Sequence, residues 1–243
     1  MIVLGLDTAT AYTTVGIVRD GVTVAEIVER TGAGHAARLP ALVAQALGQT
    51  ALTLRQVDAI AVSTGPGSFT GLRVGLGFAK GIAFAGGLRI AGVSTLEALA
   101  TAAPSRFTTI ATITDARRGE TYVAIFRRLA PDVVRVCEDL ALSPDAAVER
   151  VIETLRSESC TLVVGDAAER YPDAFGRLRR YGLEVASFDE IHPRGGVVAA
   201  LGERRLARGD ADRAEALLPV YLRAPTAEQS LRDGSLTMEN AIS

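Results

Sequence analysis

The sequence predicts an α/β fold made of two stacked subdomains, each a β-β-β-α-β-α unit with a mixed sheet. The first observation is that an apolar, strand-like segment opens each half of the chain and ends in an aspartate, Asp7 in one half and Asp115 in the other. The second is that a hairpin comes next in both halves. The third is that strand and helix periodicities then alternate in the same order. This order is typical of mixed sheets covered by helices.

In the first half, strands are predicted at 2–6, 13–18, 22–28, 57–62 and 89–93, and helices at 35–47, 70–85 and 95–102. Asp20-Gly21 indicates the hairpin, because this pair adopts the backbone angles of a tight two-residue turn. Pro40 either opens or kinks the first helix, whose apolar residues recur at helical spacing. Ser94 caps the third helix, with Glu97 at capping-box spacing.

In the second half, strands are predicted at 109–114, 121–127, 133–142, 161–164 and 185–188, and helices at 144–155, 171–180 and 194–207. Ser143-Pro144 opens one helix and Gly209 ends the last one. A short linker with Pro104 separates the halves, so we expect two subdomains, 1–103 and 104–243, with a cleft between them.

Composition limits the classes of function. The 243 residues carry a formal net charge of -2, which gives no global attraction to nucleic acid or to an anionic membrane. Cys137 and Cys160 form no disulfide framework or metal-ligand spacing, which fits a reducing cytoplasm. No basic segment precedes the first strand, and the apolar stretch 81–93 is too short to span a bilayer, so we expect a cytoplasmic protein without membrane contact.

The stretch Gly65-Pro66-Gly67-Ser68 joins a buried strand to a helix. Free N–H groups at such a helix start can hold a phosphate, so Gly65, Gly67 and Ser68 are candidate nucleotide or phosphate ligands. The turn lacks the Lys-Ser/Thr pair of a Walker loop, and a plain strand-to-helix connection is the alternative that the residues favour. Ser68 lacks the spacing of a nucleophile elbow and is better explained as a helix cap.

Several motifs carry a resemblance to a known family. They are ILGLDTAT-like Val3–Thr10, His35-x-x-Arg38-Leu39-Pro40, GPGSFTGLRVG at Gly65–Gly75, VSTLEALA at Val93–Ala100, DARRGETY at Asp115–Tyr122, and PVYLR at Pro219–Arg223. In this order, and over nearly the whole chain, they resemble the bacterial TsaB (YeaZ) family. Its members are accessory subunits in the synthesis of threonylcarbamoyladenosine on tRNA. The resemblance implies the actin-like, sugar-kinase-like ATPase fold, in agreement with the doubled pattern.

The resemblance implies a non-catalytic paralogue of the catalytic subunit, TsaD. TsaD holds a metal through a His-x-x-x-His pair, because residues four apart share one helix face. Here Leu39 follows His35 at that spacing, and His192 lies far along the chain. We therefore expect no metal, no cofactor and no activity from this chain alone. The family implies ATP, threonylcarbamoyl-adenylate and metal for the complex, a TsaE-type small ATPase as a further partner, tRNA as substrate of the complex, and a homodimer when the chain is alone.

The two first-lobe helices are the expected partner surface. Gly71, Gly75, Gly77 and Gly81 each cost about 1 kcal/mol relative to alanine in an exposed helix, so something is expected to approach this helix closely. The expected contact residues are His35, Leu39, Leu42, Val43, Leu72, Leu76, Ala79 and Ala83. On this interpretation, Leu39→Glu with Ala79→Glu abolishes pairing and leaves the fold intact. The alternative is that both helices simply cover the first sheet, which they can do with one face each and still offer another.

Two other functions stay open from the residues alone. The fold and the two aspartates, Asp7 and Asp115, fit a stand-alone ATP-dependent kinase or ATPase, with Thr8 beside Asp7 at the phosphates. Both aspartates fit equally well as turn residues that accept local backbone hydrogen bonds. The other function, a metallopeptidase, would require a bound zinc ion, and the residues give no pair of imidazoles to hold it.

Overall fold

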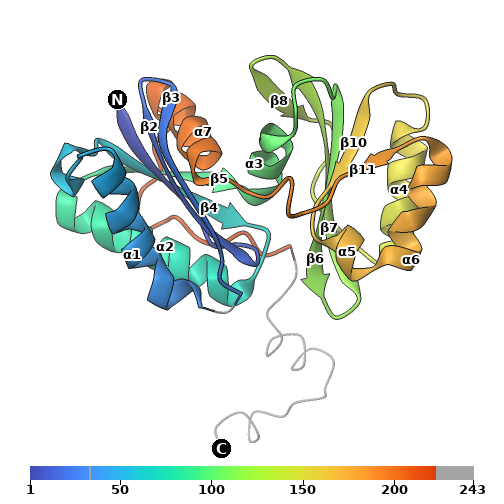
Figure 1. Ribbon diagram of the computed structural model, residues 1–243, viewed down its shortest axis with the longest axis horizontal. Helices are drawn as coiled ribbons and strands as arrows, with labels where there is room; N and C mark the ends of the chain where they lie inside the picture. The colour runs from blue at the N-terminus through green and yellow to red at the C-terminus, as the bar shows by residue number, and fades with distance from the viewer. Residues whose placement is uncertain (33, 223–243) are drawn as a thin grey trace, which may run out of the picture.

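The computed structural model describes residues 1–32 and 34–222, and these form two lobes side by side (Figure 1). The first lobe contains a five-stranded sheet and the second a six-stranded one. Helix α3 (Thr95–Ala102) lies between them, because Leu96 and Leu99 pack with the second sheet while Ala98 packs with the first. The predicted fold class, two subdomains with mixed sheets, is confirmed.

The first sheet has the strand order β3-β2-β1-β4-β5. Its strands are β1 (Ile2–Asp7), β2 (Tyr12–Arg19), β3 (Val22–Arg30), β4 (Ala59–Gly65) and β5 (Arg89–Ser94). Strands β1, β2 and β3 are antiparallel neighbours, whereas β4 and β5 run parallel to β1. Strands β1 and β4 are apolar and almost wholly buried, as expected for strands that are covered on both faces.

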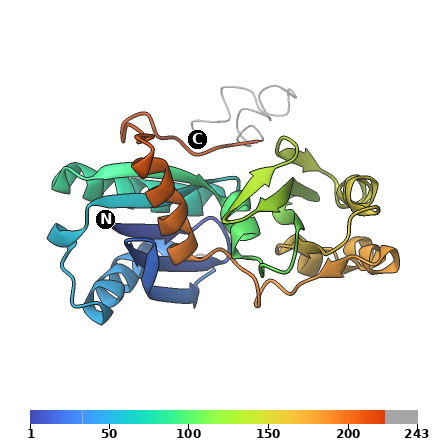
Figure 2. The same ribbon diagram turned by 90° about the horizontal axis from the view of Figure 1, so that it is seen from above.

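Helices cover both faces of the first sheet. On one face lie α1 (His35–Gln49) and α2 (Phe69–Gly86), with the short 3-10 helix η1 (Leu54–Gln56) between α1 and β4. On the other face lies α7 (Gly195–Ala207) (Figure 2). A Cβ on Gly5 would meet the Gly195 carbonyl oxygen at 2.0 Å, and one on Gly16 would meet the Gly196 nitrogen at 2.0 Å. Only glycine lets the α7 backbone approach β1 and β2 this closely.

The position of α7 corrects the predicted subdomain boundary. A division at 103/104 assigns residues 194–207 to the second subdomain, but α7 packs on the first sheet. Glu26 of β3 fixes the start of α7, because its carboxylate accepts hydrogen bonds from the Gly195 N–H at 3.0 Å and the Gly196 N–H at 2.9 Å. The first lobe is therefore completed by a helix from the far end of the chain.

The second sheet repeats the topology of the first. Its strands are β6 (Thr109–Arg117), β7 (Glu120–Leu129), β8 (Asp132–Arg135), β10 (Thr161–Val164) and β11 (Glu184–Val185), in the order β11-β10-β6-β7-β8, with β9 (Leu140–Leu142) also paired to β7. As in the first lobe, the first three strands are antiparallel and the later two run parallel to the opening strand. The predicted duplication is confirmed.

Two elements of the second lobe differ from the prediction. The strand expected at 133–142 is two short strands, β8 and β9, which both pair with β7. The helix expected at 171–180 is broken into α5 (Ala167–Arg170), α6 (Pro172–Phe175) and the 3-10 helix η2 (Gly176–Tyr181). Pro172 lacks the N–H that would continue α5, and this explains the break. Helix α4 (Pro144–Leu155) forms as predicted, with Ser143 as its cap.

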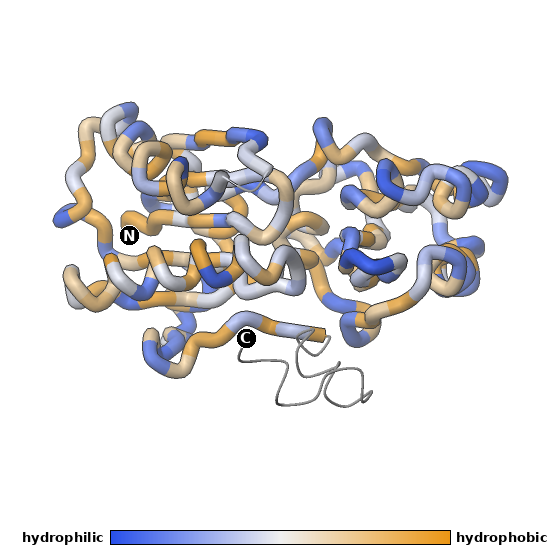
Figure 3. The backbone as a smooth tube through the Cα atoms, turned by 90° about the horizontal axis from the view of Figure 1, so that it is seen from below, coloured by the Kyte–Doolittle hydropathy of each residue, from blue (hydrophilic) through white to orange (hydrophobic). Residues whose placement is uncertain are grey.

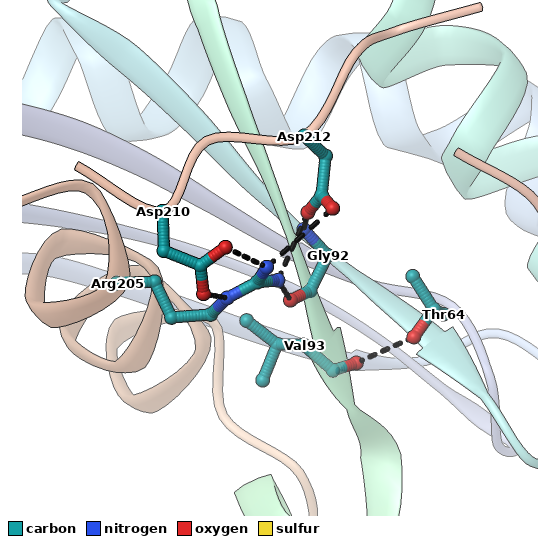
Figure 4. A network of polar contacts seen from close by, with 6 residues as sticks. All are labelled: Thr64, Gly92, Val93, Arg205, Asp210 and Asp212. Carbon is teal, nitrogen blue, oxygen red and sulfur yellow. Dashed lines mark hydrogen bonds and ion pairs between the residues drawn. The ribbon is translucent and has the colours of Figure 1, made fainter. Parts of the chain in front are cut away.

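After α7 the chain returns along the first lobe as the segment Asp212–Leu222, which we call the strap; it has a turn at 214–216 and no regular secondary structure (Figures 2 and 3). Asp212 forms a bridge to Ile90 of β5, and its carboxylate accepts a hydrogen bond from the Gly92 N–H at 2.7 Å. Arg205 of α7 joins this anchor by ion pairs to Asp210 at 2.7 Å and to Asp212 at 2.9 Å (Figure 4). The strap thus covers the open edge of the sheet at β5.

Within the described ranges 1–32 and 34–222, no helix is both long enough and apolar enough to cross a bilayer.

Candidate functional site

The junction between β4 and α2 is packed tightly against the loop that comes after β1. Ser68 caps α2, because its hydroxyl accepts a hydrogen bond from the Gly71 N–H at 3.2 Å. The Ser68 N–H donates to the Ala9 carbonyl at 2.7 Å, and the Thr8 hydroxyl donates to the Gly71 carbonyl at 2.7 Å. The Gly71 N–H, the Ser68 N–H and the Thr8 hydroxyl, which could donate hydrogen bonds to a phosphate, therefore already donate within the chain.

The glycines of this junction have an intramolecular explanation. A Cβ on Gly67 would meet the Ala9 carbonyl oxygen at 2.4 Å, and one on Gly71 would meet the Thr8 carbonyl oxygen at 2.0 Å. Gly65 has a φ of 111°, and a Cβ there would meet the Val220 carbonyl oxygen of the strap at 2.9 Å. These contacts support the interpretation as a tight connection. Nucleotide binding by Gly65, Gly67, Ser68 and Thr8 stays a prediction that these contacts do not favour.

Asp7 lies at the end of β1 and is completely buried. Its Oδ1 accepts a hydrogen bond from the Ala9 N–H at 3.1 Å, whereas Oδ2 has no hydrogen-bond partner among the residues that the structure describes. Burial raises the pKa of Asp7 to about 6, against smaller lowering effects of the Ser63 hydroxyl and the Ala9 N–H. A carboxylate enclosed in this way has no open path to a ligand, so it fits a turn residue better than a metal-phosphate ligand.

Asp115, the equivalent aspartate of the second lobe, has several partners. Its carboxylate accepts hydrogen bonds from the Arg117 N–H at 2.9 Å and the Tyr171 hydroxyl at 3.1 Å, and it forms an ion pair with the Arg117 guanidinium at 3.4 Å. The Asp115 N–H donates to Asp166 at 2.8 Å. Burial raises the pKa of Asp166 to about 6. The structure thus pairs Asp115 with Asp166, which the sequence pattern did not connect.

The histidines have separate structural roles. Nδ1 of His35 lies 2.7 Å from the Thr13 hydroxyl and 3.1 Å from the Thr31 hydroxyl, and burial lowers its pKa. Leu39, at the position of the second metal-binding histidine in the pattern, is fully buried in the first-lobe core. The ring of His192 stacks on that of Tyr12 with centroids 4.5 Å apart. Over residues 1–32 and 34–222, no group of three or more His, Cys, Asp or Glu residues is placed to hold a metal ion.

The residues predicted to contact a partner are buried. They are His35, Leu39, Leu42, Val43, Leu72, Leu76, Ala79 and Ala83, all at most 5% exposed. Most of them belong to the hydrophobic core between α1, α2 and the sheet. Their burial does not favour the predicted partner contact, which stays a prediction, because apolar residues at helical spacing mark the face that covers the sheet. Leu39→Glu with Ala79→Glu would therefore place carboxylates in the core and unfold the lobe.

The same two helices expose a second face, which we call the outer face. We define it by seven exposed residues, six of them small or apolar: Ala37, Ala41 and Ala44 of α1, and Arg73, Gly77, Gly81 and Phe84 of α2. Exposed polar side chains of the same helices, among them Arg38, Gln45 and Thr70, lie beside them. No atom of the described residues lies within 4 Å of a Cβ built on Gly77 or Gly81, in contrast to Gly71 and Gly75, which meet Thr8. Phe84 is 86% exposed. Close packing within the chain therefore explains Gly71 and Gly75, and it does not explain Gly77 and Gly81.

Sequence reasoning allowed a second face on these helices but did not assign the residues of the outer face, although their signal is present. Ala37, Ala41 and Ala44 recur at spacings of four and three residues, and so do Arg73, Gly77, Gly81 and Phe84. These positions fall between those of the apolar stripes. Small residues add little to a hydrophobicity pattern, yet on a helix flank they permit close approach of another backbone. The residues that indicate a second face were therefore the small ones outside the apolar stripe of each helix.

The sequence is similar to one described family and to several known proteins. The family model described as "TsaD: tRNA N6-adenosine threonylcarbamoyltransferase" matches residues 25–229. The TsaB protein of Escherichia coli is 32% identical over 234 residues, which cover 95% of this chain and 98% of that protein. The TsaB protein of Bacillus subtilis is 29% identical over 127 residues, covering 52% of this chain and 56% of that protein.

Solved structures agree. YeaZ from Pseudomonas aeruginosa superposes with a TM-score of 0.77 at 27% identity, over 91% of this chain and 99% of that one. An activator of 2-hydroxyisocaproyl-CoA dehydratase from Clostridium difficile has a TM-score of 0.50 at 12% identity, over 88% of this chain and 99% of that one, which shows a shared fold only. Fold and site thus define a two-lobed protein of the actin-like, sugar-kinase-like fold class, whose β4–α2 junction is closed by contacts within the chain. Within that class, the chain belongs to the TsaB (YeaZ) family, in the wider family described by the TsaD model.

Proposed function

We propose that this chain is the accessory subunit of a cytoplasmic complex that forms threonylcarbamoyladenosine on tRNA, and that it pairs with a TsaD-type catalytic subunit. The observation that carries the proposal is the similarity to E. coli TsaB, which extends over 98% of that protein. The engagement of His35 by Thr13 and the burial of Leu39 support a role other than metal binding for this helix start. The relatives do not favour the stand-alone kinase or the metallopeptidase.

The outer face of α1 and α2 is the proposed contact with the catalytic subunit. Gly77 and Gly81 each cost about 1 kcal/mol of helix stability relative to alanine and have no neighbour within the described chain that requires glycine. A partner helix that packs against the two glycines would gain close contact there. Phe84, which is 86% exposed, supplies a large apolar side chain at the end of the same face.

The remaining parts of the complex follow from this role. ATP, threonylcarbamoyl-adenylate and the metal ion belong to the partner subunits, and tRNA is the substrate of the assembled complex. A TsaE-type small ATPase docks on the pair. When the catalytic subunit is absent, a second copy of this chain occupies the outer face, because an exposed apolar helix face favours self-association.

Reconstituted tRNA modification tests the proposal. We expect modification to be lost when this chain is omitted, and to be lost again with Ala41→Glu plus Gly77→Glu, which adds charge to exposed positions of the outer face. Val134→Glu, at a residue of β8 that is 48% exposed, is the matched control and keeps full activity. Modification that proceeds equally well without the chain would refute the accessory role, and normal activity of the double variant would refute the interface.

A further inference from the structure

The strap spans the boundary between the two lobes. At its start Asp212 is fixed to β5 and Arg205, and Leu217 enters the first-lobe core, where it is 9% exposed. At its end Leu222 packs against the hydrophobic cluster of the second lobe. One short segment therefore contacts the cores of both lobes.

Between these ends the strap crosses the β4–α2 junction. The Val220 N–H donates to the Thr64 carbonyl at 2.8 Å, immediately before Gly65. Because a Cβ on Gly65 would lie 2.9 Å from the Val220 carbonyl oxygen, the glycine is what admits the strap at this distance. The strap therefore rests on the turn from which α2 starts.

Tyr221 contacts the first turns of α2 directly. Its ring packs on that of Phe69 with centroids 5.3 Å apart, and its hydroxyl accepts a hydrogen bond from Nε of Arg73 at 3.2 Å. The Arg73 guanidinium lies 3.6 Å above the centroid of the Phe69 ring. Phe69 and Arg73 are four residues apart and share one face of α2, so Tyr221 holds both the first residue of the helix and the next turn.

We propose that Tyr221 is a positioning residue that ties the start of α2 to the second lobe, with Leu222 as the anchor on that lobe. The orientation of the outer face then depends on the angle between the two lobes. A change in that angle shifts α2, because the strap transmits the movement. The consequence for pairing rests on the proposed function, since it requires that α2 meet the partner. The coupling itself is a property of the isolated chain.

Variants at three strap positions separate this coupling from a loss of folding. Tyr221→Ala removes the ring contact and the hydrogen bond, Tyr221→Phe removes the hydrogen bond only, and Leu222→Ser removes the second-lobe anchor. Leu218→Ser is the matched control, because Leu218 lies on the same strap and is 68% exposed. The measurements are hydrogen exchange of the backbone amides of α2 and the distance between lobes in the full chain.

The distance is measured between dyes on Cys160, which is exposed on the second lobe, and on Gln49→Cys at the end of α1, with Cys137→Ala to leave no other thiol. We expect Tyr221→Ala to speed exchange in the first two turns of α2 about tenfold and to broaden the distance distribution. Tyr221→Phe restores most of the protection. Leu222→Ser broadens the distance distribution with a smaller effect on α2, and Leu218→Ser changes neither.

Unchanged exchange and distance in Tyr221→Ala would overturn the proposal. So would equal effects of Tyr221→Ala and Leu218→Ser, because the strap would then act without specific contacts. Both measurements use the chain without a TsaD-type subunit, diluted until it is monomeric. If the coupling is found and the wild-type chain still fails to bind a TsaD-type subunit, the proposed function is at fault and the positioning role stands.

Discussion

The two lobes share a topology and differ in the helices that come after β4 in the first lobe and after β10 in the second. Both have the same strand order, and both have a glycine with positive φ where that strand ends, Gly65 at 111° and Gly165 at 133°. In the first lobe an 18-residue helix comes next, with one face on the sheet and another exposed. In the second lobe three short helices take its place. The common framework makes the fold, and the uninterrupted helix of the first lobe makes the candidate interface.

The opening strands of the lobes differ in a similar way. Asp7 is enclosed and has an unpartnered Oδ2, whereas Asp115 accepts hydrogen bonds from Arg117 and Tyr171. Positions that are equivalent in a duplicated fold therefore have different electrostatic environments. An assignment of function by position alone would treat the two aspartates as one kind of site, which their contacts contradict.

The largest effect on stability is expected from substitution of Gly165 and Gly65, the glycines where β10 and β4 end. In Gly165→Ala the new Cβ would lie 1.9 Å from the Ile113 carbonyl oxygen within the sheet, at a φ that alanine rarely adopts. We expect a loss of about 4 kcal/mol in the free energy of unfolding, or roughly 8–16 °C in melting temperature. Gly65→Ala is the matched change in the first lobe. It meets the strap, which can move, so we expect a smaller loss in a thermal melt.

A melting temperature that falls more for Gly65→Ala than for Gly165→Ala would contradict this ranking. It would show that the strap is held as rigidly as the sheet.

The two aspartates give the next comparison. The pKa of Asp7 is raised from 3.8 to about 6, so the folded state disfavours the charged carboxylate by about 3 kcal/mol above pH 6. Between pH 6 and 4 the folded state binds this proton more readily than the unfolded state, and stability from this group increases as the pH falls. Asp7→Asn is therefore expected to be more stable than wild type at pH 7.5, by at most that amount. Urea unfolding at several pH values measures the gap, which closes toward pH 4.

Asp115→Asn is the counterpart in the second lobe and has the opposite expected sign. Its carboxylate lies 3.4 Å from the Arg117 guanidinium, so neutralising it destabilises the chain at pH 7.5. If Asp7 only closes a turn, Asp7→Asn also retains tRNA modification in the reconstituted system. Loss of modification with retained stability would instead make Asp7 a functional group.

Within α2, paired alanine substitutions test the division between inner and outer glycines. Gly71→Ala brings a Cβ to 2.0 Å from the Thr8 carbonyl oxygen, and we expect a loss of about 1–3 kcal/mol. Gly77→Ala meets no atom within 4 Å and is expected to stabilise the isolated chain by about 1 kcal/mol. Chemical denaturation measures both. A destabilising Gly77→Ala would mean that this glycine has a role inside the chain after all.

The sequence predicted the parts of the fold that local patterns determine. Alternation and glycine or proline punctuation located the strands of both sheets, and the Ser68 and Ser94 caps lie at helix starts as predicted. The place of α7 was not predictable in this way, since it depends on glycines of β1 and β2 that meet a helix almost 200 residues later in the chain. The broken helix did have a local signal in Pro172, which outweighs the apolar periodicity around it.

The candidate site was predicted only to the level of the helix. The family motifs identified α1 and α2, but the apolar stripes of these helices belong to the core, and the exposed alanines and glycines are the residues left for a partner. Periodicity separates the two faces of a helix. When both faces consist of apolar or small residues, periodicity does not show which of them packs on the sheet. The strap contacts of Tyr221 join residues almost 150 positions apart, and a single sequence carries no local signal for such a pair.

The smallest effect on stability is expected from the ion pairs that join the two lobes. Asp132, at the turn that opens β8, forms ion pairs with Arg204 at 2.8 Å and Arg208 at 3.7 Å of the first-lobe helix α7 and the residue after it. These side chains are partly exposed, so Asp132→Asn is expected to cost no more than about 1 kcal/mol, and less in high salt. Urea unfolding at low and high ionic strength measures this difference. A larger cost that salt leaves unchanged would mean that this pair, rather than the strap and α3, holds the two lobes in register.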